Sequence, residues 1–274
     1  MLSAIHFLNI LLPFLYLASF AVYTYDFVKD KVALTNAKRI FLFLSLLFHL
    51  VYLIIRTIEF DHPPITTVYE IFTLLAFTIG CTYFLLELLT DVRGTGLFII
   101  FFSLIFQIIS SVYIDDLFQV QEVLRSNLLG LHVMSALLGY SAITISAVYG
   151  ILFMFLYADI KSNKFGIIFN RLPSLETLEK LSFYSVVIGF ILLTIAIVIG
   201  AIWLPKAFPD FNHFDPKLIA TSLVWIIYGI GISAKIIAKW YGKKVIIFSL
   251  IGFGLAISSM ILTNLFEQSF HNFY

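Results

Sequence analysis

Six histidines are the side chains of this sequence best suited to coordinate a metal or to carry protons. They are dispersed along the chain, at His6, His49, His62, His132, His213 and His271. Imidazole is a ligand for transition metals and haem iron, and it titrates near physiological pH. Compact structural metal sites show close ligand pairs such as HxxxH or CxxC, and the sequence has neither. Two interpretations stay open: paired axial ligands of a flat macrocycle, or interfacial side chains held by water and lipid headgroups.

Cysteine content, net charge and short motifs exclude several function classes. The single cysteine, Cys81, lies inside an apolar block, so no intrachain disulfide and no C-x-x-C-H haem attachment can form. Thiol–disulfide exchange is therefore not expected. The formal net charge is +1, and no P-loop or dinucleotide fingerprint is present. We expect no nucleic-acid partner.

The elements that must position the histidines are membrane-spanning helices. The chain is 61% hydrophobic and 12% charged, whereas about one quarter of a soluble domain is charged. Its apolar blocks can cross ~30 Å of hydrocarbon at about 1.5 Å per residue, and they lack the short alternation of a barrel. We predict an all-α polytopic membrane helix bundle, a single membrane domain over residues 1–274. About eight spans are expected, at 3–26, 40–57, 67–90, 97–114, 128–157, 181–204, 218–240 and 245–266.

Basic residues alternate in density from one predicted connection to the next. Of the 17 lysines and arginines, 13 fall in or beside connections on one side of the membrane. Because basic loops stay in the cytoplasm, both termini are predicted on the outer side. All histidines except His49 then lie near the outer surface. The expected location is multi-pass in the cell's inner, or cytoplasmic, membrane.

Carboxylates near two predicted span starts differ in how easily they are explained. Asp215 precedes Pro216 at the start of the seventh span, where an aspartate caps a helix and its charge favours the positive end of the dipole. Glu70 follows Tyr69 at the start of the third span. A carboxylate so near the membrane needs a partner, and Arg56 is the candidate.

The longest basic-side connection, Asp159–Lys180, contains the segment LPSLETLEK. Pro173, followed by Ser174 and a Glu/Leu pattern, suggests a short amphipathic interfacial helix before the sixth span. An ordinary linker explains the same residues equally well, so both interpretations stay open.

Four segments are notable for their order and spacing. They are DHPPITTVYE at 61–70, LHVMSALLGYSA at 131–142, IWLPKAFPDFNHFDPKLIATSLVW at 202–225 and NLFEQSFHNFY at 264–274. Together they resemble the cytochrome c assembly family, the CcsA, CcmC and HemX group, over roughly residues 40–274. In order, they are similar to the family's outer loop ending in Tyr-Glu, its helix opening with an outward histidine, its tryptophan-rich haem-binding loop, and its last helix with a second outward histidine.

The resemblance implies a haem b, noncovalently bound at the outer face, with its iron ligated by His132 and His271. It also implies that the segment Phe208–Lys217 covers the macrocycle. The implied cofactor-binding residues are His132, His271, Trp203, Phe208, Phe211, Phe214, Asp215 and Lys217. Secondary candidates are His62, Tyr69, Glu70 and His213.

The sequence also departs from the family pattern. Phe208, Asn212 and Phe214 stand where the loop's tryptophans would be, and Ser233 stands where CcsA-type members carry a histidine in the following span. An inner, transmembrane haem site is therefore not expected unless His49 contributes. These departures bring the chain closest to the HemX-like branch, whose members accompany haem biosynthesis.

The predicted function is haem handling at the outer membrane face, for cytochrome c maturation or haem supply. Expected partners are haem, the lipid membrane, and either other maturation proteins or a haem-biosynthesis enzyme. This interpretation favours a binding and assembly factor over a stand-alone enzyme. Two alternatives remain: a HemX-like regulator of haem biosynthesis acting through a protein partner, and a small-solute transporter unrelated to haem.

Overall fold

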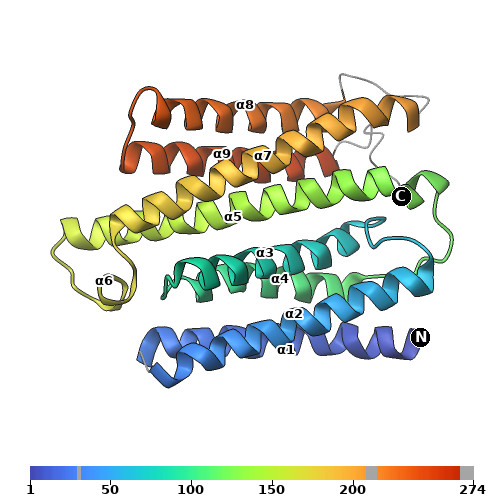
Figure 1. Ribbon diagram of the computed structural model, residues 1–274, viewed down its shortest axis with the longest axis horizontal. Coiled ribbons are helices and arrows are strands. Elements are labelled where there is room, and N and C mark those ends of the chain that lie inside the picture. The colour runs from blue at the N-terminus through green and yellow to red at the C-terminus, as the bar shows by residue number, and fades with distance from the viewer. Residues whose placement is uncertain (30–31, 208–214, 266–274) are drawn as a thin grey trace. The chain divides into compact units, whose positions relative to one another are not determined.

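The computed structural model describes residues 1–29, 32–207 and 215–265 (Figure 1). The described residues form helices joined by turns and loops, with no strand among them. Several predicted site residues lie outside the described residues: Phe208, Phe211, His213, Phe214 and His271.

The described helices divide between two compact units. Unit 1 comprises Met1–Gly130 together with Asn170–Pro173, and unit 2 comprises Leu131–Phe169 and the described residues from Ser174 onward. The first part of the chain forms α1 (Leu2–Lys29), α2 (Val32–Phe60), α3 (Val68–Thr90), α4 (Gly96–Tyr113) and the short 3-10 helix η1 (Glu122–Arg125). The second part forms α5 (Asn127–Lys161), α6 (Ile167–Arg171), α7 (Leu175–Ala207), α8 (Pro216–Ile236) and α9 (Lys243–Leu265).

The helices agree with the spans predicted from hydrophobicity. Within the described residues, seven helices are long and apolar enough to cross a membrane, namely α1, α2, α3, α4, α5, α7 and α8. The helix α9 coincides with the eighth predicted span. The prediction of an all-helical, multi-pass membrane protein is confirmed, and the side on which the termini lie stays a prediction.

One predicted helix boundary is wrong, and the structure decides one question that the sequence left open. Helix α2 begins at Val32 rather than near residue 40, so Lys38 and Arg39 lie within a helix instead of in the preceding loop. The segment LPSLETLEK forms no separate interfacial helix, because α7 already begins at Leu175. The hydroxyl of Ser174 accepts a hydrogen bond from the backbone N–H of Thr177 at 3.2 Å and so caps this helix start.

Unit 1 is built from four packed helices. Helix α1 packs against α2 and α4, and α3 packs against the same two helices. The faces that meet carry an unusual number of polar side chains, including Ser19, Ser45, Thr73, Ser103 and Gln107, all fully or almost fully buried. Because the surrounding hydrocarbon cannot satisfy these groups, most bond to side chains of neighbouring helices: Ser19 to Ser45 and Thr73 to Gln107, each at 2.9 Å.

Unit 2 is held together by close helix contacts at small residues. A Cβ atom added to Gly139 of α5 would lie 2.9 Å from Leu193 of α7, and one added to Gly189 of α7 would lie 3.0 Å from the carbonyl oxygen of Gly139. Glycine at both positions therefore lets the two backbones approach closely. Helices α8 and α9 form a hairpin that packs on α7 (Figure 1).

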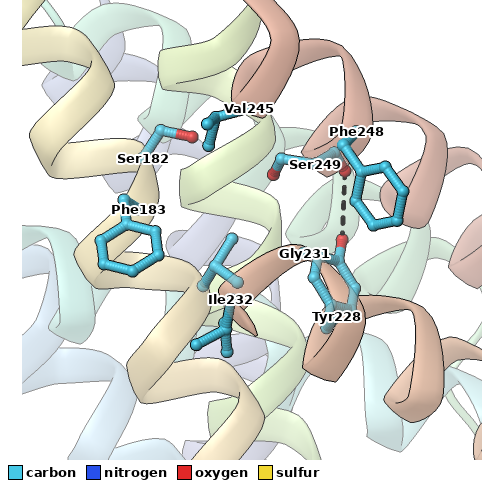
Figure 2. A pocket seen from close by; sticks show the side chains of 9 residues that line it. Ser182, Phe183, Tyr228, Gly231, Ile232, Val245, Phe248 and Ser249 are labelled. Atoms are coloured by element: carbon cyan, nitrogen blue, oxygen red, sulfur yellow. Dashed lines mark hydrogen bonds between the residues drawn. The ribbon is translucent and has the colours of Figure 1, made fainter. Parts of the chain in front are cut away.

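A small cavity of about 20 Å³ lies between α7, α8 and α9 (Figure 2). Its lining residues are Ser182, Phe183, Val186, Tyr228, Gly231, Ile232, Val245, Phe248 and Ser249. The serine hydroxyls beside it bond to Ser146 of α5, at 2.9 Å from Ser182 and 3.1 Å from Ser249. The hydroxyls therefore satisfy one another, and the space left between them is smaller than any cofactor.

Candidate functional site

The imidazole of His132, in the first turns of α5, is oriented by the backbone of α7. Its Nδ1 atom lies 2.8 Å from the carbonyl oxygen of Ala196. A carbonyl only accepts hydrogen bonds, so Nδ1 carries the hydrogen and a neutral ring has its lone pair on Nε2. Histidines that ligate metals commonly donate their second ring N–H to a carbonyl in this way.

Glycine at position 200 makes room for this ring. A Cβ atom at Gly200 would lie 2.9 Å from Cε1 of His132 and 3.1 Å from its Nδ1. Gly189, Leu193, Ala196 and Gly200 recur at intervals of four, three and four residues, so they lie on one face of α7. The face of α7 that packs closely against α5 therefore also provides the space for the His132 ring.

Two further predicted residues lie at the same end of unit 2. Trp203 follows Gly200 by about one turn of α7 and is half-buried. Asp215 is buried and directly precedes α8, which begins at Pro216, and its carbonyl accepts the backbone N–H of Ile219 at 3.1 Å. The predicted helix start at Asp215 is therefore confirmed.

Three predicted residues, His132, Trp203 and Asp215, thus belong to unit 2. Lys217 lies in the first turn of α8. The second predicted ligand, His271, and the covering residues from Phe208 to Phe214 lie outside the described residues.

Trp225 has a packing role in the interior of unit 2. Its indole N–H donates to the hydroxyl of Thr194 at 2.7 Å, and its ring stacks on Phe190 with centroids 5.2 Å apart. Ser233, which stands in place of the histidine of CcsA-type members, is exposed on α8. Neither Trp225 nor Ser233 therefore offers a ligand for a haem inside the membrane.

Both ring nitrogens of His49, in unit 1, take part in hydrogen bonds. Thr73 donates its hydroxyl hydrogen to Gln107 at 2.9 Å, so it accepts from His49 Nε2, also 2.9 Å away. His49 Nδ1 consequently accepts from the hydroxyl of Tyr16 at 2.9 Å. The ring joins α1, α2 and α3 and is fully buried. These contacts give His49 a structural role and give no support to an inner haem site.

The partner expected for Glu70 is present. Arg56 donates from Nε to Glu70 at 3.1 Å, and also bonds Asp116 at 3.0 Å. The other Glu70 oxygen accepts the backbone N–H and the hydroxyl of Thr66, at 2.8 and 2.6 Å. The backbone N–H of Glu70 donates to the side chain of Thr67, the N-cap of α3. The sequence Thr-x-x-Glu is the signature that signals such a capped helix start.

The other two secondary candidates in the Asp61–Glu70 segment make contacts within unit 1. Both ring nitrogens of buried His62 lie 2.9 Å from backbone carbonyl oxygens, those of Pro63 and Leu117. This ring ties the α2–α3 connection to the α4–α5 connection. Tyr69 stacks on Tyr113 with ring centroids 5.4 Å apart. A role of these residues in cofactor binding stays a prediction.

Sequence reasoning missed a buried cluster at the opposite end of unit 1. Glu87 is 0% exposed and accepts the hydroxyl of Tyr23 at 2.5 Å, with Lys38 at 3.3 Å. Lys38 also donates to Asp26 at 2.8 Å. The signal was in the sequence, because Glu87 interrupts the apolar run of the third span, where a carboxylate needs a partner.

An exposed ion pair lies beside this cluster, at the end of α3. Arg39 bonds Asp91, and this guanidinium holds the pKa of the Asp91 carboxyl below its ordinary value. The charge of Arg93 lowers the same pKa further.

The sequence matches the cytochrome C assembly protein family over residues 8–271, so the chain belongs to that family. It is similar to the cytochrome c biogenesis protein CcsA of Mesostigma viride, 25% identical over 80% of this chain and 80% of the relative. Its similarity to CcsA of Chlamydomonas reinhardtii is 26% over 86% of this chain and 67% of the relative. Protein HemX of Bacillus subtilis is 30% identical over 44% of each chain. The predicted membership in this family is thereby confirmed.

Proposed function

We propose that the protein binds haem noncovalently and handles it at the membrane, for cytochrome c maturation or for haem supply. In this proposal His132 and His271 provide the two axial imidazoles, on the outer face of the cell's inner membrane. Membership in the cytochrome c assembly family supports a haem-related role, since cytochrome c maturation consumes haem.

The observation that carries the proposal is the orientation of His132. Its Nδ1–H donates to the carbonyl of Ala196, so the lone pair of the neutral ring lies on Nε2. An imidazole held in this tautomer suits an axial ligand, because the hydrogen bond fixes the ring and raises the basicity of the ligating nitrogen. Gly200 leaves space for this ring position.

Bound haem would supply an iron whose axial positions accept imidazole nitrogen. Other residues of the chain would contact the rest of the haem. Trp203 can offer an aromatic face to a flat apolar ligand, with stacking worth ~1 kcal/mol. Asp215 directly precedes α8 and belongs to the segment Phe208–Lys217, which is proposed to cover the ligand. Lys217, in the first turn of α8, carries a positive charge that can neutralise a propionate.

The test is an absorption spectrum of protein purified from membranes, before and after addition of haemin. We expect a b-type Soret band that is strongly weakened in His132→Ala and in His271→Ala. The variant His6→Ala is the control, because this exposed histidine bonds Asp116 in unit 1 and should leave the band unchanged. A colourless protein that also fails to bind added haemin would overturn the proposal.

A regulatory role in haem biosynthesis is the second candidate. It is favoured by the replacement of loop tryptophans by Phe208, Asn212 and Phe214, together with the similarity to a HemX protein. In this case the bound haem would act as a signal passed to a protein partner. Deleting the gene should then change tetrapyrrole levels while c-type cytochromes still mature. Unchanged tetrapyrrole pools would argue against this role.

A further inference from the structure

The α5–α7 connection, residues 162–174, presents an apolar cluster on its surface. Phe165, Ile167 and Phe169 are 61%, 45% and 37% exposed. The two phenylalanine rings pack edge to face, with centroids 4.8 Å apart, and so form one apolar unit. Apolar side chains gathered on an exposed connection mark an interaction surface.

Two lysines beside this cluster lack acidic partners. Lys161 ends α5 and Lys164 follows it closely, and both are exposed. Among the described residues, no carboxylate lies within ion-pair distance of either lysine. Two other lysines of unit 2 are paired, with Lys180 at 2.7 Å from Glu176 and Lys235 bonded to Glu179. The described residues therefore leave the charges of Lys161 and Lys164 without a counter-anion.

The position of the connection indicates which anion this is. Helices α5 and α7 contain 35 and 33 residues. Each is therefore about 50 Å long, which exceeds the ~30 Å of a hydrocarbon core and reaches the headgroup layer. The connection between their ends lies at the membrane surface, where lipid phosphates are the most abundant anions.

We propose that the α5–α7 connection is an anionic-lipid binding surface. Phe165, Ile167 and Phe169 insert at the boundary between headgroups and acyl chains, and Lys161 and Lys164 bind lipid phosphates. This combination of apolar residues and flanking lysines is how interfacial segments attach to anionic membranes. A protein partner at the same surface is the competing explanation, but the membrane already lies beside these residues.

Insertion is tested by labelling at single cysteines. In a Cys81→Ser background, a nitroxide is placed at Phe165→Cys, at Phe169→Cys or, as the matched control, at Asn163→Cys. The full chain is reconstituted in phosphatidylcholine vesicles containing phosphatidylglycerol. We expect the labels at 165 and 169 to be accessible to oxygen and shielded from a water-soluble relaxant, and the label at 163 to show the reverse. Water exposure at all three positions would overturn the proposal.

Lipid charge is tested with the double variant Lys161→Gln/Lys164→Gln. Phosphatidylglycerol retained by the purified protein is measured by native mass spectrometry, against phosphatidylcholine. We expect an affinity loss of roughly fivefold for each lysine, the factor that ~1 kcal/mol represents. Lys180→Gln, which removes a paired lysine, should retain phosphatidylglycerol as the wild type does. Unchanged retention in the double variant would overturn the proposal. Loss of a co-purifying protein with lipid retention unchanged would assign the surface to a protein partner instead.

Discussion

The interiors of the two units differ in how they satisfy polar groups. Unit 1 buries formal charges: Lys38 and Glu87 near one end and Arg56 and Glu70 near the other, each at most 1% exposed. The described interior of unit 2 is instead joined by hydroxyls, such as Ser146 with Ser182 and Ser249. Its ion pair between Lys235 and Glu179 is less deeply buried.

This difference indicates that the two units fix their helix registers by different means. A buried charge is costly unless its partner stands in the correct position, so the pairs of unit 1 penalise any shift of α2 against α3. Hydroxyl contacts within membranes are weak, at ~0.6 kcal/mol. In unit 2, register depends more on close packing, as at Gly139 and Gly189. Among the described residues, those predicted as primary haem contacts, His132, Trp203, Asp215 and Lys217, all lie in unit 2.

The largest effect is expected from breaking the Arg56–Glu70 pair. Arg56→Met leaves the buried Glu70 carboxylate without a cation and should lower the free energy of unfolding by about 3–5 kcal/mol. The unit 2 counterpart, Lys235→Met, should lose less, about 1–2 kcal/mol, because Glu179 is less deeply buried and keeps a hydrogen bond from the backbone N–H of Gly242. Both can be measured by denaturant titration of the purified protein in detergent.

The double variant Arg56→Met/Glu70→Leu is the control for this prediction. It removes both charges, so it should be more stable than Arg56→Met alone. If the double variant were the less stable of the two, the cost would come from lost packing rather than from an unpaired charge.

Replacing His49 or His132 by phenylalanine should show which histidine contributes to stability and which contributes to haem binding. His49→Phe leaves the buried Tyr16 hydroxyl without its acceptor and should cost about 1–2 kcal/mol of unfolding free energy while the Soret band persists. His132→Phe should abolish most of that band with a smaller effect on stability. Absorption spectra and denaturant titration of the same samples measure both. If instead His49→Phe lost the Soret band and His132→Phe lost more unfolding free energy, His49 would be the haem ligand and His132 the structural residue.

A smaller effect is expected at the glycine beside His132. In Gly200→Ala the new methyl group would lie 2.9 Å from Cε1 of His132, so the ring must move. Disturbing a ligand's orientation in this way typically weakens metal affinity by about 10-fold or more. Gly130→Ala is the matched control, since a Cβ there meets no atom within 4 Å. Haemin titration should show weaker binding for Gly200→Ala only.

Removing a hydroxyl from the interior of unit 2 should have little effect. Ser146→Ala deletes the contacts to Ser182 and Ser249, and we expect a loss of about 0.6 kcal/mol in unfolding free energy. A loss comparable to that of Arg56→Met would show that hydroxyls specify unit 2 as strongly as charges specify unit 1.

The smallest effect on stability is expected from breaking the exposed ion pair between Arg39 and Asp91. The Arg39 guanidinium holds the pKa of Asp91 below its ordinary value, so this carboxylate stabilises the folded state at neutral pH. The contribution is lost as the pH falls through the lowered pKa. The thermal midpoint of Asp91→Asn should therefore lie slightly below that of the wild type near neutrality, and the two should converge in acid.

Local features of the sequence were sufficient to predict several parts of the structure. The capped start of α3 and the start of α8 at Pro216 follow from motifs within a few residues. The pairing of Glu70 with Arg56 was also predictable, because a carboxylate near hydrocarbon needs a nearby cation. The early start of α2 was missed because Lys38 and Arg39 carry charges typical of a loop, and only their partners on other helices make a helix there favourable.

The sequence by itself determined the class of protein and its helical spans, because long apolar blocks must satisfy their backbone within helices in a membrane. It also carried the family motifs that include His132 and His271. The tertiary structure decided which groups meet: His132 and Ala196 are 64 positions apart, and Tyr16 and His49 are 33 apart. Such contacts depend on which helix faces pack together, and hydrophobicity along one helix does not encode this choice.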